Sequence, residues 1–106
     1  VDVPLTRMVN QEYAPGDWIN LRIPSVNLIN WHPFSIGSFY RTSPTHATVF
    51  VKGRGAWTNK LLGKVNPELG TTSTVKLHVE GPVGVRQKTY LNMDQMVILG
   101  AGTGIT

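Results

Sequence analysis

The sequence predicts an all-β fold for most of the chain, and two features favour this class. Seven prolines and eleven glycines are spread among short apolar runs, a pattern typical of many turns joining many strands. Several of these runs alternate apolar with polar residues, as strands with one buried face do. A length of 106 residues, with 41% apolar and 15% charged, suits one hydrophobic core and no second autonomous core.

Two strands separated by a turn are predicted at the beginning of the chain. Val1–Asn10 is the first, and Pro4 places its beginning at a sheet edge because proline has no N–H for a neighbouring strand. A turn is expected at Tyr13–Gly16. Ile19–Ile23 then alternates aliphatic residues with Asn and Arg, so we expect a half-buried strand, which Pro24 ends.

Two more strands are predicted before the middle of the chain. Phe34–Tyr40 is expected to be extended, and a loop rich in Ser, Thr and Pro follows at Arg41–His46. Ala47–Val51 alternates apolar with other residues in the manner of a strand and runs into a glycine turn at Gly53–Gly55.

One short helix is predicted at residues 58–63, with Thr58 as its N-cap and Gly63 as the left-handed residue at its end. Val75–Val79 alternates again and predicts a strand, which a turn at Gly81–Gly84 closes. The segment Val85–Gln95 shows no clear pattern.

The C-terminal residues change in character. Met96–Leu99 is a continuous apolar run, as in strands of parallel sheets that are buried on both faces. Glycines follow at Gly100–Gly104, where backbone N–H groups could approach a phosphate. The alternative is an ordinary glycine turn, which has the same sequence pattern. A boundary near Asp94 is therefore expected, with residues 1–94 forming one domain and residues 95–106 opening a second.

Charge and composition narrow the function without deciding it. The chain has no cysteine, which excludes disulfides, thiolate metal sites and thiol catalysis. Its net charge of +4 suits a phosphate-bearing cofactor, an acidic partner, an anionic membrane leaflet or nucleic acid. No run of about 18 apolar residues occurs, so this piece is expected to be soluble, without a membrane span or signal peptide.

Two strings are candidate binding elements. Gly55–Thr58 is a glycine loop that feeds a helix start, where free N–H groups and the helix dipole would suit a pyrophosphate. The alternative is that Thr58 simply caps its own helix. In His32–Ser35, Pro33 fixes an aromatic ring and a hydroxyl in register, as a planar heterocycle would need. Here the alternative is a pair of core aromatics beside a turn.

Five strings in this order resemble the ferredoxin-NADP reductase superfamily, and specifically its ferric reductase and NADPH oxidase branch. His-Pro-Phe-Ser is similar to the HPF(S/T) signature of that branch, whereas soluble reductases generally carry Arg-x-Tyr-Ser/Thr there. The difference favours the membrane branch. The five strings are Pro15–Ile19, His32–Ser35, Val51–Thr58, Glu80–Gly84 and Ala101–Thr106.

The resemblance implies an antiparallel six-stranded Greek-key β-barrel of the flavin-reductase type with one short helix, followed by the first strand of a truncated nucleotide-binding α/β domain. It also implies an FAD-binding domain of a transmembrane oxidoreductase that passes electrons from NADPH through FAD to haem and then to ferric iron or dioxygen. The domain would lie on the cytosolic side. Its partners would be the NAD(P)H domain and the haem-bearing transmembrane domain of the same parent chain, and the fragment alone should not turn over.

The resemblance also implies residue roles. Phe34 would lie along the flavin ring, Ser35 near its reactive nitrogen, and His32 near the ribityl or phosphate portion. Thr58 and the N–H groups after Gly55 would hold the pyrophosphate, with Lys52 and Arg54 as supplementary cations. The implied FAD-binding residues are His32, Pro33, Phe34, Ser35, Val51, Lys52, Gly55, Trp57 and Thr58, and the NAD(P)H-binding residues are Gly100, Gly102, Thr103 and Gly104.

The same residues also allow other classes of function. A basic β-barrel could stack single-stranded nucleic acid on Trp18, Trp31, Trp57 and Tyr40, but these aromatics are not regularly interleaved with cations, and we expect no nucleic-acid partner. A fragment of a soluble flavin reductase is a further alternative. A metal site is not expected, because the three histidines lack the spacing of metal ligands. A Ser-His-Asp hydrolase is not expected either, because the sequence has no nucleophile elbow.

Overall fold

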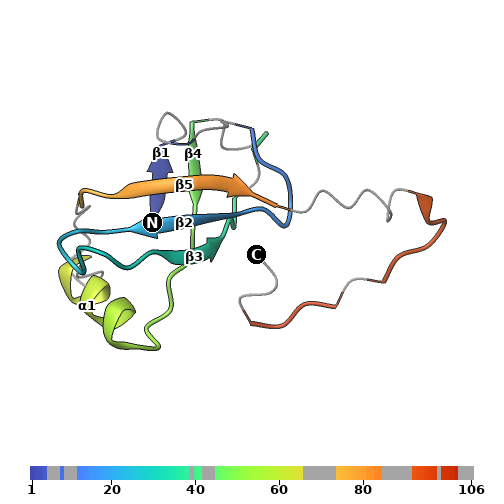
Figure 1. Cartoon of the computed structure of the whole chain (residues 1–106). Helices are drawn as coiled ribbons and strands as arrows, with labels where there is room; N and C mark the ends of the chain where they lie inside the picture. Colours follow the sequence, from blue (N-terminus) through green and yellow to red (C-terminus); the bar gives the residue numbers. More distant parts are fainter. Residues whose placement is uncertain are drawn as a thin grey trace.

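The fold is mostly β, with antiparallel sheets and one short helix among the residues that the computed structural model describes, namely 1–4, 8, 12–38, 40–41, 45–65, 74–84, 92–97 and 99–102. This confirms the predicted class. The elements in chain order are β1 (Asp2–Pro4), β2 (Trp18–Arg22), β3 (His32–Ser35), β4 (His46–Thr48), α1 (Ala56–Val65) and β5 (His78–Val83), as labelled in Figure 1.

The strands form two sheets that cross one another. One sheet has the order β3-β2-β5 and the other pairs β1 with β4. Figure 1 shows the strands of the smaller sheet running across those of the larger one. The chain passes between the sheets at the end of β3, where Ile36 N donates to Asp17 O at 3.0 Å and the next amide, Gly37 N, donates to Thr48 O at 2.8 Å. An isolated bridge between Ile36 and Val49 marks the same junction.

The predicted closed barrel of six strands is not what the described strands form. They number five, and neither sheet closes on itself. Closure requires a hydrogen-bonded neighbour on both edges of every strand. Within the described residues, β5 pairs with β2 and β1 pairs with β4, so these two strands leave an edge open.

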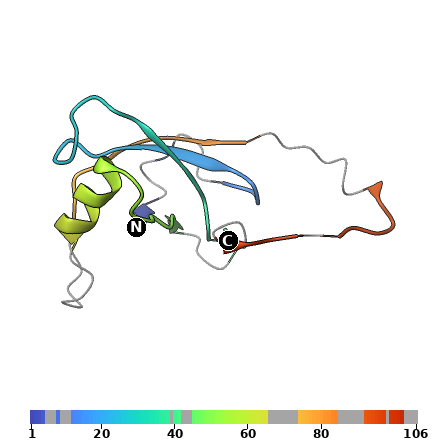
Figure 2. The same cartoon turned by 90° about the horizontal axis from the view of Figure 1, so that it is seen from below.

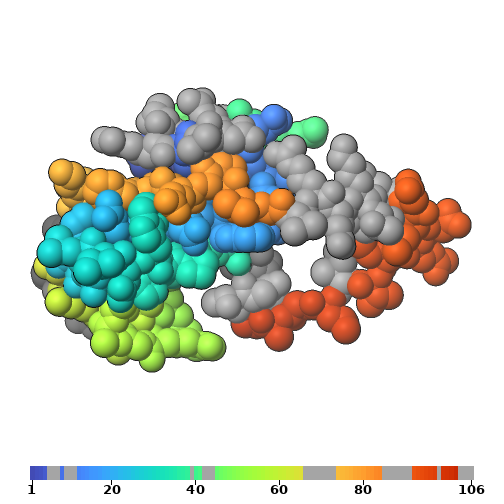
Figure 3. Space-filling view, viewed as in Figure 1, coloured from blue at the N-terminus to red at the C-terminus, as the bar shows by residue number. Residues whose placement is uncertain are grey.

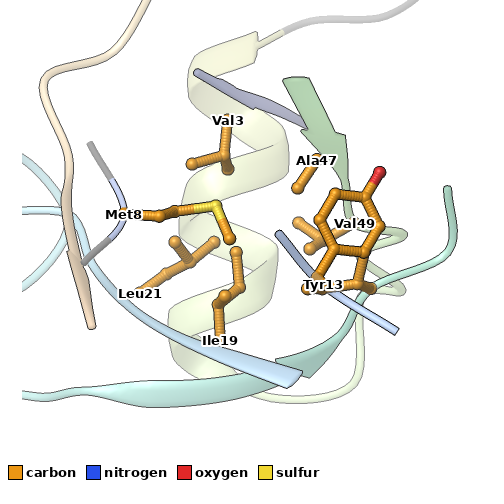
Figure 4. Packing of buried hydrophobic residues seen from close by; sticks show 8 residues of the cluster. Val3, Met8, Tyr13, Ile19, Leu21, Ala47 and Val49 are labelled. Carbon is orange, nitrogen blue, oxygen red and sulfur yellow. The ribbon is translucent and has the colours of Figure 1, made fainter. Parts of the chain in front are cut away.

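The main core lies between the two sheets, and it follows the predicted alternation. Ile19, Leu21 and Ile23 are fully buried, while the residues between them on β2 are half-exposed, which confirms the period-2 prediction for this strand. Ala47 and Val49, on the side of the other sheet, are also fully buried. Figure 4 shows Ile19 and Leu21 together with Ala47 and Val49 in this core. The buried cluster consists of Val3, Met8, Tyr13, Ile19, Leu21, Ile36, Ala47 and Val49.

The helix covers one end of the larger sheet. Leu61 is its fully buried residue and packs with Ile23 and with Val26 from the loop after β2. Figure 2 shows α1 below the end of the sheet, next to that loop. This second cluster fixes the helix relative to the end of β2 and the loop that follows it.

The helix limits differ from the prediction. It runs over Ala56–Val65, so Thr58 is its third residue and not its N-cap, and Gly63 lies inside it. The first intrahelical hydrogen bond joins Asn59 N to Gly55 O at 3.0 Å, which makes Gly55 the N-cap. A helix starts earlier than an obvious capping residue when a side chain further on reaches back to the cap, as Thr58 does here.

The limits of several strands also differ from the prediction; β4, for example, covers His46–Thr48 where a strand over Ala47–Val51 was expected. β3 begins at His32 and hydrogen-bonding to β2 ends at Ser35, because the chain then turns to the second sheet. β5 starts at His78 and runs through the expected turn to Val83, with an irregular register opposite β2. Glycine with a φ of 120° at Gly81 makes this possible, since an L side chain rarely adopts such a φ.

Met96, Val97 and Leu99 are the described residues of the buried strand expected at Met96–Leu99, and none of them is in a strand; Ile98 lies outside the described residues. Met96, Val97 and Leu99 are 55%, 86% and 92% exposed, and no sheet pairing involves them. Figure 3 shows this segment, coloured orange-red, standing apart from the strands. A strand buried on both faces needs neighbours in a sheet, and no described segment supplies one.

Candidate functional site

A pocket of about 310 Å³ opens between β3, the segment after β4, and the beginning of α1. Residues from both candidate strings lie in its wall, including Ser35 and Thr58. Pockets of a few hundred cubic ångströms with a few convergent polar groups are typical of ligand sites. The lining residues are Pro33, Phe34, Ser35, Phe50, Lys52, Arg54 and Thr58.

One side of the pocket is β3. Its pairing with β2 places Phe34 opposite Ile19 and Ser35 opposite Trp18. Successive side chains of a strand point to opposite faces, and here His32 and Phe34 are half-buried while Pro33 and Ser35 are exposed. Phe34 also packs against the main core, so its ring has a fixed position at the pocket.

The second side is the segment that follows β4. Phe50, Lys52 and Arg54 are exposed and line the pocket, while the residues between them are buried or half-buried. Phe50 is 56% exposed and was not among the predicted site residues. The signal for it was the period-2 alternation, because Val49 and Val51 face the core and Phe50 must therefore face the other way.

The third side is the N-terminal end of α1. Thr58 Oγ1 accepts hydrogen bonds from Arg54 N at 2.9 Å and Gly55 N at 3.1 Å, and it donates to Gly55 O. This folds the loop back on the helix. The amides of Ala56 and Trp57 precede the first intrahelical bond, so the helix offers them no acceptor. The positive end of the helix dipole and two cations thus meet at this side of the pocket.

A ring contact joins β3 to the helix behind the pocket. The rings of His32 and Trp57 have centroids 4.2 Å apart, and those of Phe34 and Trp57 are 5.9 Å apart. His32 Nε2 and Trp57 Nε1 are both buried without a hydrogen-bond partner. Buried polar groups are normally paired, so these two nitrogens could serve a ligand or bound water.

The structure gathers most of the predicted FAD-site residues. His32 and Trp57 stand behind the pocket, and Gly55 caps the helix. The side chain of Val51 packs against both hydrophobic clusters and is not among those that line the pocket. The predicted residues that line the pocket are Pro33, Phe34, Ser35, Lys52 and Thr58.

The predicted NAD(P)H residues that the structure describes, Gly100 and Gly102, do not line this pocket. Gly100 and Gly102 are exposed on the C-terminal segment, and Thr103 and Gly104 lie outside the described residues. Within the described ranges, no helix combines the length and apolar character needed to cross a bilayer. Those same ranges contain no group of three or more His, Cys, Asp or Glu side chains positioned to hold a metal ion.

The fold is a β domain whose pocket combines an aromatic ring, hydroxyl groups and two cations beside the N-terminal end of a helix. Comparison with known proteins agrees: the FAD-binding domain family matches residues 1–87. The chain therefore belongs to the FAD-binding domain family of ferric reductases and NADPH oxidases.

Named relatives support the same family. Ferric reduction oxidase 3, mitochondrial, of Arabidopsis thaliana is 33% identical over 97 residues, covering 89% of this chain and 13% of that protein. Ferric reduction oxidase 8, mitochondrial, of the same plant is 33% identical over 107 residues, covering 98% and 14%. NADPH oxidase 5 of Homo sapiens is 27% identical over 125 residues, covering 89% and 16%. The chain thus spans only a small part of the length of these relatives.

Proposed function

We propose that the pocket between β3 and α1 is the FAD site of this domain. The observation that carries the proposal is the convergence of Phe34 and Ser35 with Lys52, Arg54 and Thr58 in one cavity wall. FAD has a planar ring that can lie against an aromatic side chain, polar ring atoms that can bond a hydroxyl, and a pyrophosphate that suits an anion-binding end. When bound, FAD supplies hydride acceptance and one-electron donation, which amino-acid side chains do not provide.

The residues present fit this cofactor. Phe34 offers an aromatic face whose position is set by core packing, and Ser35 offers a hydroxyl on the exposed side of β3. At the other end, the free amides of the helix start and the cations of Lys52 and Arg54 suit a pyrophosphate. His32 and Trp57 hold the two ends at a fixed separation through their ring contact.

For the whole protein, we propose a transmembrane NADPH-dependent oxidoreductase of the ferric reductase or NADPH oxidase type. Its electrons would pass from NADPH through FAD to haem and then to ferric iron or dioxygen. The names of the relatives, ferric reduction oxidase and NADPH oxidase, support both acceptors. The domain would lie on the cytosolic side, in contact with an NAD(P)H domain and a haem-bearing membrane domain of the same parent chain.

Two finer features of the fold belong to the same proposal. Residues 1–94 would form a closed six-stranded Greek-key barrel, with the bridge between Ile36 and Val49 as the seam that already links the two sheets. Residues 95–106 would open the NAD(P)H-binding domain, and Met96–Leu99 would become a buried strand there. The high exposure of Val97 and Leu99 fits a segment whose sheet neighbours lie elsewhere.

Titration of the chain with FAD tests the proposed site. Quenching of flavin fluorescence and the appearance of bound-flavin absorption should report saturable binding, with no NADPH oxidation by the chain alone. Ser35→Ala and Phe34→Leu should weaken binding, whereas Ser25→Ala, an exposed serine in the loop after β2, should not. Undiminished FAD binding by both pocket variants would place the cofactor elsewhere.

A further inference from the structure

The loop of residues 24–31, between β2 and β3, presents two large aliphatic side chains to solvent although its backbone is held firmly. Leu28 is 72% exposed and Ile29 is 79% exposed. Directly before them, Asn27 Oδ1 accepts hydrogen bonds from Ile29 N at 2.9 Å and Asn30 N at 3.0 Å. The loop backbone therefore fixes these two side chains outward, where they contribute nothing to the core of the domain.

Arg22 braces the same loop from β2. Its Nη1 donates to Leu28 O at 3.2 Å, and its guanidinium carbon lies 5.1 Å from the centre of the Trp31 ring. Trp31 is 37% exposed, and Val26 anchors the loop on Leu61 of α1. A tryptophan and an arginine thus stand at the base of a protruding aliphatic tip.

The surroundings of this tip are basic. Lys60 and Lys64 are exposed on α1, and Lys76 is exposed in the segment that packs beside the helix. The described stretches that build this end of the domain, residues 18–31, 50–65 and 74–79, contain no Asp or Glu. Figure 3 shows the cyan loop and the yellow-green helix adjoining on the same face.

We propose that this loop and α1 form a contact surface for an anionic lipid bilayer. Leu28 and Ile29 enter the boundary between headgroups and acyl chains, and Trp31 and Arg22 lie at headgroup level, where such side chains are favoured. The lysines of α1 contact the anionic headgroups. Aliphatic insertion combined with cation attraction is how peripheral surfaces hold to membranes.

The observations favour lipid over nucleic acid as the occupant. Leu28 and Ile29 offer no stacking surface for bases, and one face of Trp31 is already covered by Arg22. The side chains proposed to contact lipid, namely Arg22, Leu28, Ile29, Trp31, Lys60 and Lys64, are not among those that line the pocket, so lipid contact and FAD binding can be measured and can fail independently.

Vesicle flotation with the full chain tests the proposal. The chain should float with phosphatidylcholine vesicles that contain phosphatidylserine, and less with phosphatidylcholine alone, and added salt should weaken the association. Joint replacement by Leu28→Ser and Ile29→Ser should lower the partition coefficient about tenfold or more. Lys60→Glu with Lys64→Glu should lower it on anionic vesicles only.

Matched controls use exposed residues outside the surface. Leu99→Ser removes an equally exposed leucine, and Arg41→Glu reverses a distant exposed cation, so both should leave partitioning nearly unchanged. Near-UV circular dichroism verifies that each variant is folded. Vesicle binding that survives the Leu28 and Ile29 replacements, or falls as much with Leu99→Ser, would overturn the proposal. So would salt-sensitive binding of a single-stranded oligonucleotide in the absence of vesicle binding.

Discussion

The imidazole ring of His32 lies against the indole of Trp57, with centroids 4.2 Å apart and planes inclined by 33°. This contact joins β3 to the first turn of α1, and Phe34 meets the same indole from two positions further along the strand. The strand side and the helix side of the pocket are thus connected through the side chain of Trp57. The geometry of the candidate FAD site should therefore depend on Trp57 more than on any single polar group.

Replacement of Trp57 should separate the two sides of the pocket. For Trp57→Ala we expect the free energy of unfolding to fall by about 2–3 kcal/mol, because a half-buried ring with core contacts is lost, and FAD binding should weaken with it. Trp57→Phe keeps a ring and removes an indole N–H that is buried without a partner, so its loss should stay below about 1 kcal/mol. Urea denaturation of both variants measures this; equal losses would contradict the role of the ring.

The hydroxyl of Thr58 should matter for stability even without a ligand. Thr58→Val keeps the shape of the side chain but removes the acceptor for the Arg54 and Gly55 amides, so we expect a loss of about 1 kcal/mol. Thr58→Ser retains the oxygen and should lie closer to the original protein. Thermal unfolding by circular dichroism compares them, and a valine variant as stable as the serine variant would argue against this cap.

Glycine at position 81 is required by its backbone and its neighbours. Its φ is 120°, and a Cβ there would lie 3.2 Å from Trp18 O and from Ile19 Cγ2. We expect Gly81→Ala to lower the free energy of unfolding by about 1–3 kcal/mol. Gly63→Ala is the matched change, since it lies in α1 with nothing within 4 Å of the added carbon and should stabilise by about 0.5–1 kcal/mol. Urea denaturation decides whether the two substitutions have opposite signs.

Cations at the pocket should make FAD affinity depend on salt. Lys52→Gln should weaken FAD binding severalfold at low ionic strength and flatten its decrease as salt is added, because one screened attraction is gone. Arg41→Gln removes a cation that does not line the pocket and should leave both quantities unchanged. Fluorescence titrations at several salt concentrations give the comparison. Identical salt dependence for Lys52→Gln and the unmodified chain would remove Lys52 from the site.

Local patterns predicted the strands well where one face is buried. The alternation over Ile19–Ile23 identified β2, since a period of two is imposed by the pleat itself. The alternation over Ala47–Val51 likewise places Phe50 on the outward face, although Phe50 is not among the predicted site residues. The sequence resemblance also supplied His32–Ser35 and Thr58 as parts of one cofactor site.

The limits of the helix and strands, and the pairing of the strands, were harder to predict from the sequence, because they depend on contacts with residues that are distant along the chain. The beginning of α1 was misplaced because Gly55 has no side chain to signal a cap, and Thr58 serves the cap from inside the helix. The expected turn after Val79 became part of β5, since Gly81 allows the strand to continue opposite Trp18. Met96, Val97 and Leu99 are exposed, because apolar composition does not make a strand without a neighbouring strand to pair with.

The sequence by itself determined the β class, the alternation of β2 and the short helix, and it indicated the candidate binding strings, since these follow from local periodicity and from residue types at fixed spacing. Only the tertiary structure decided that Ser35 and Thr58 border one pocket, that Val51 turns to the core, and that Leu28 and Ile29 protrude together beside a basic helix. The physical reason is that these relations join residues from different elements, whose placement comes from the packing of Leu61 and Trp57 against the sheet and not from any local pattern.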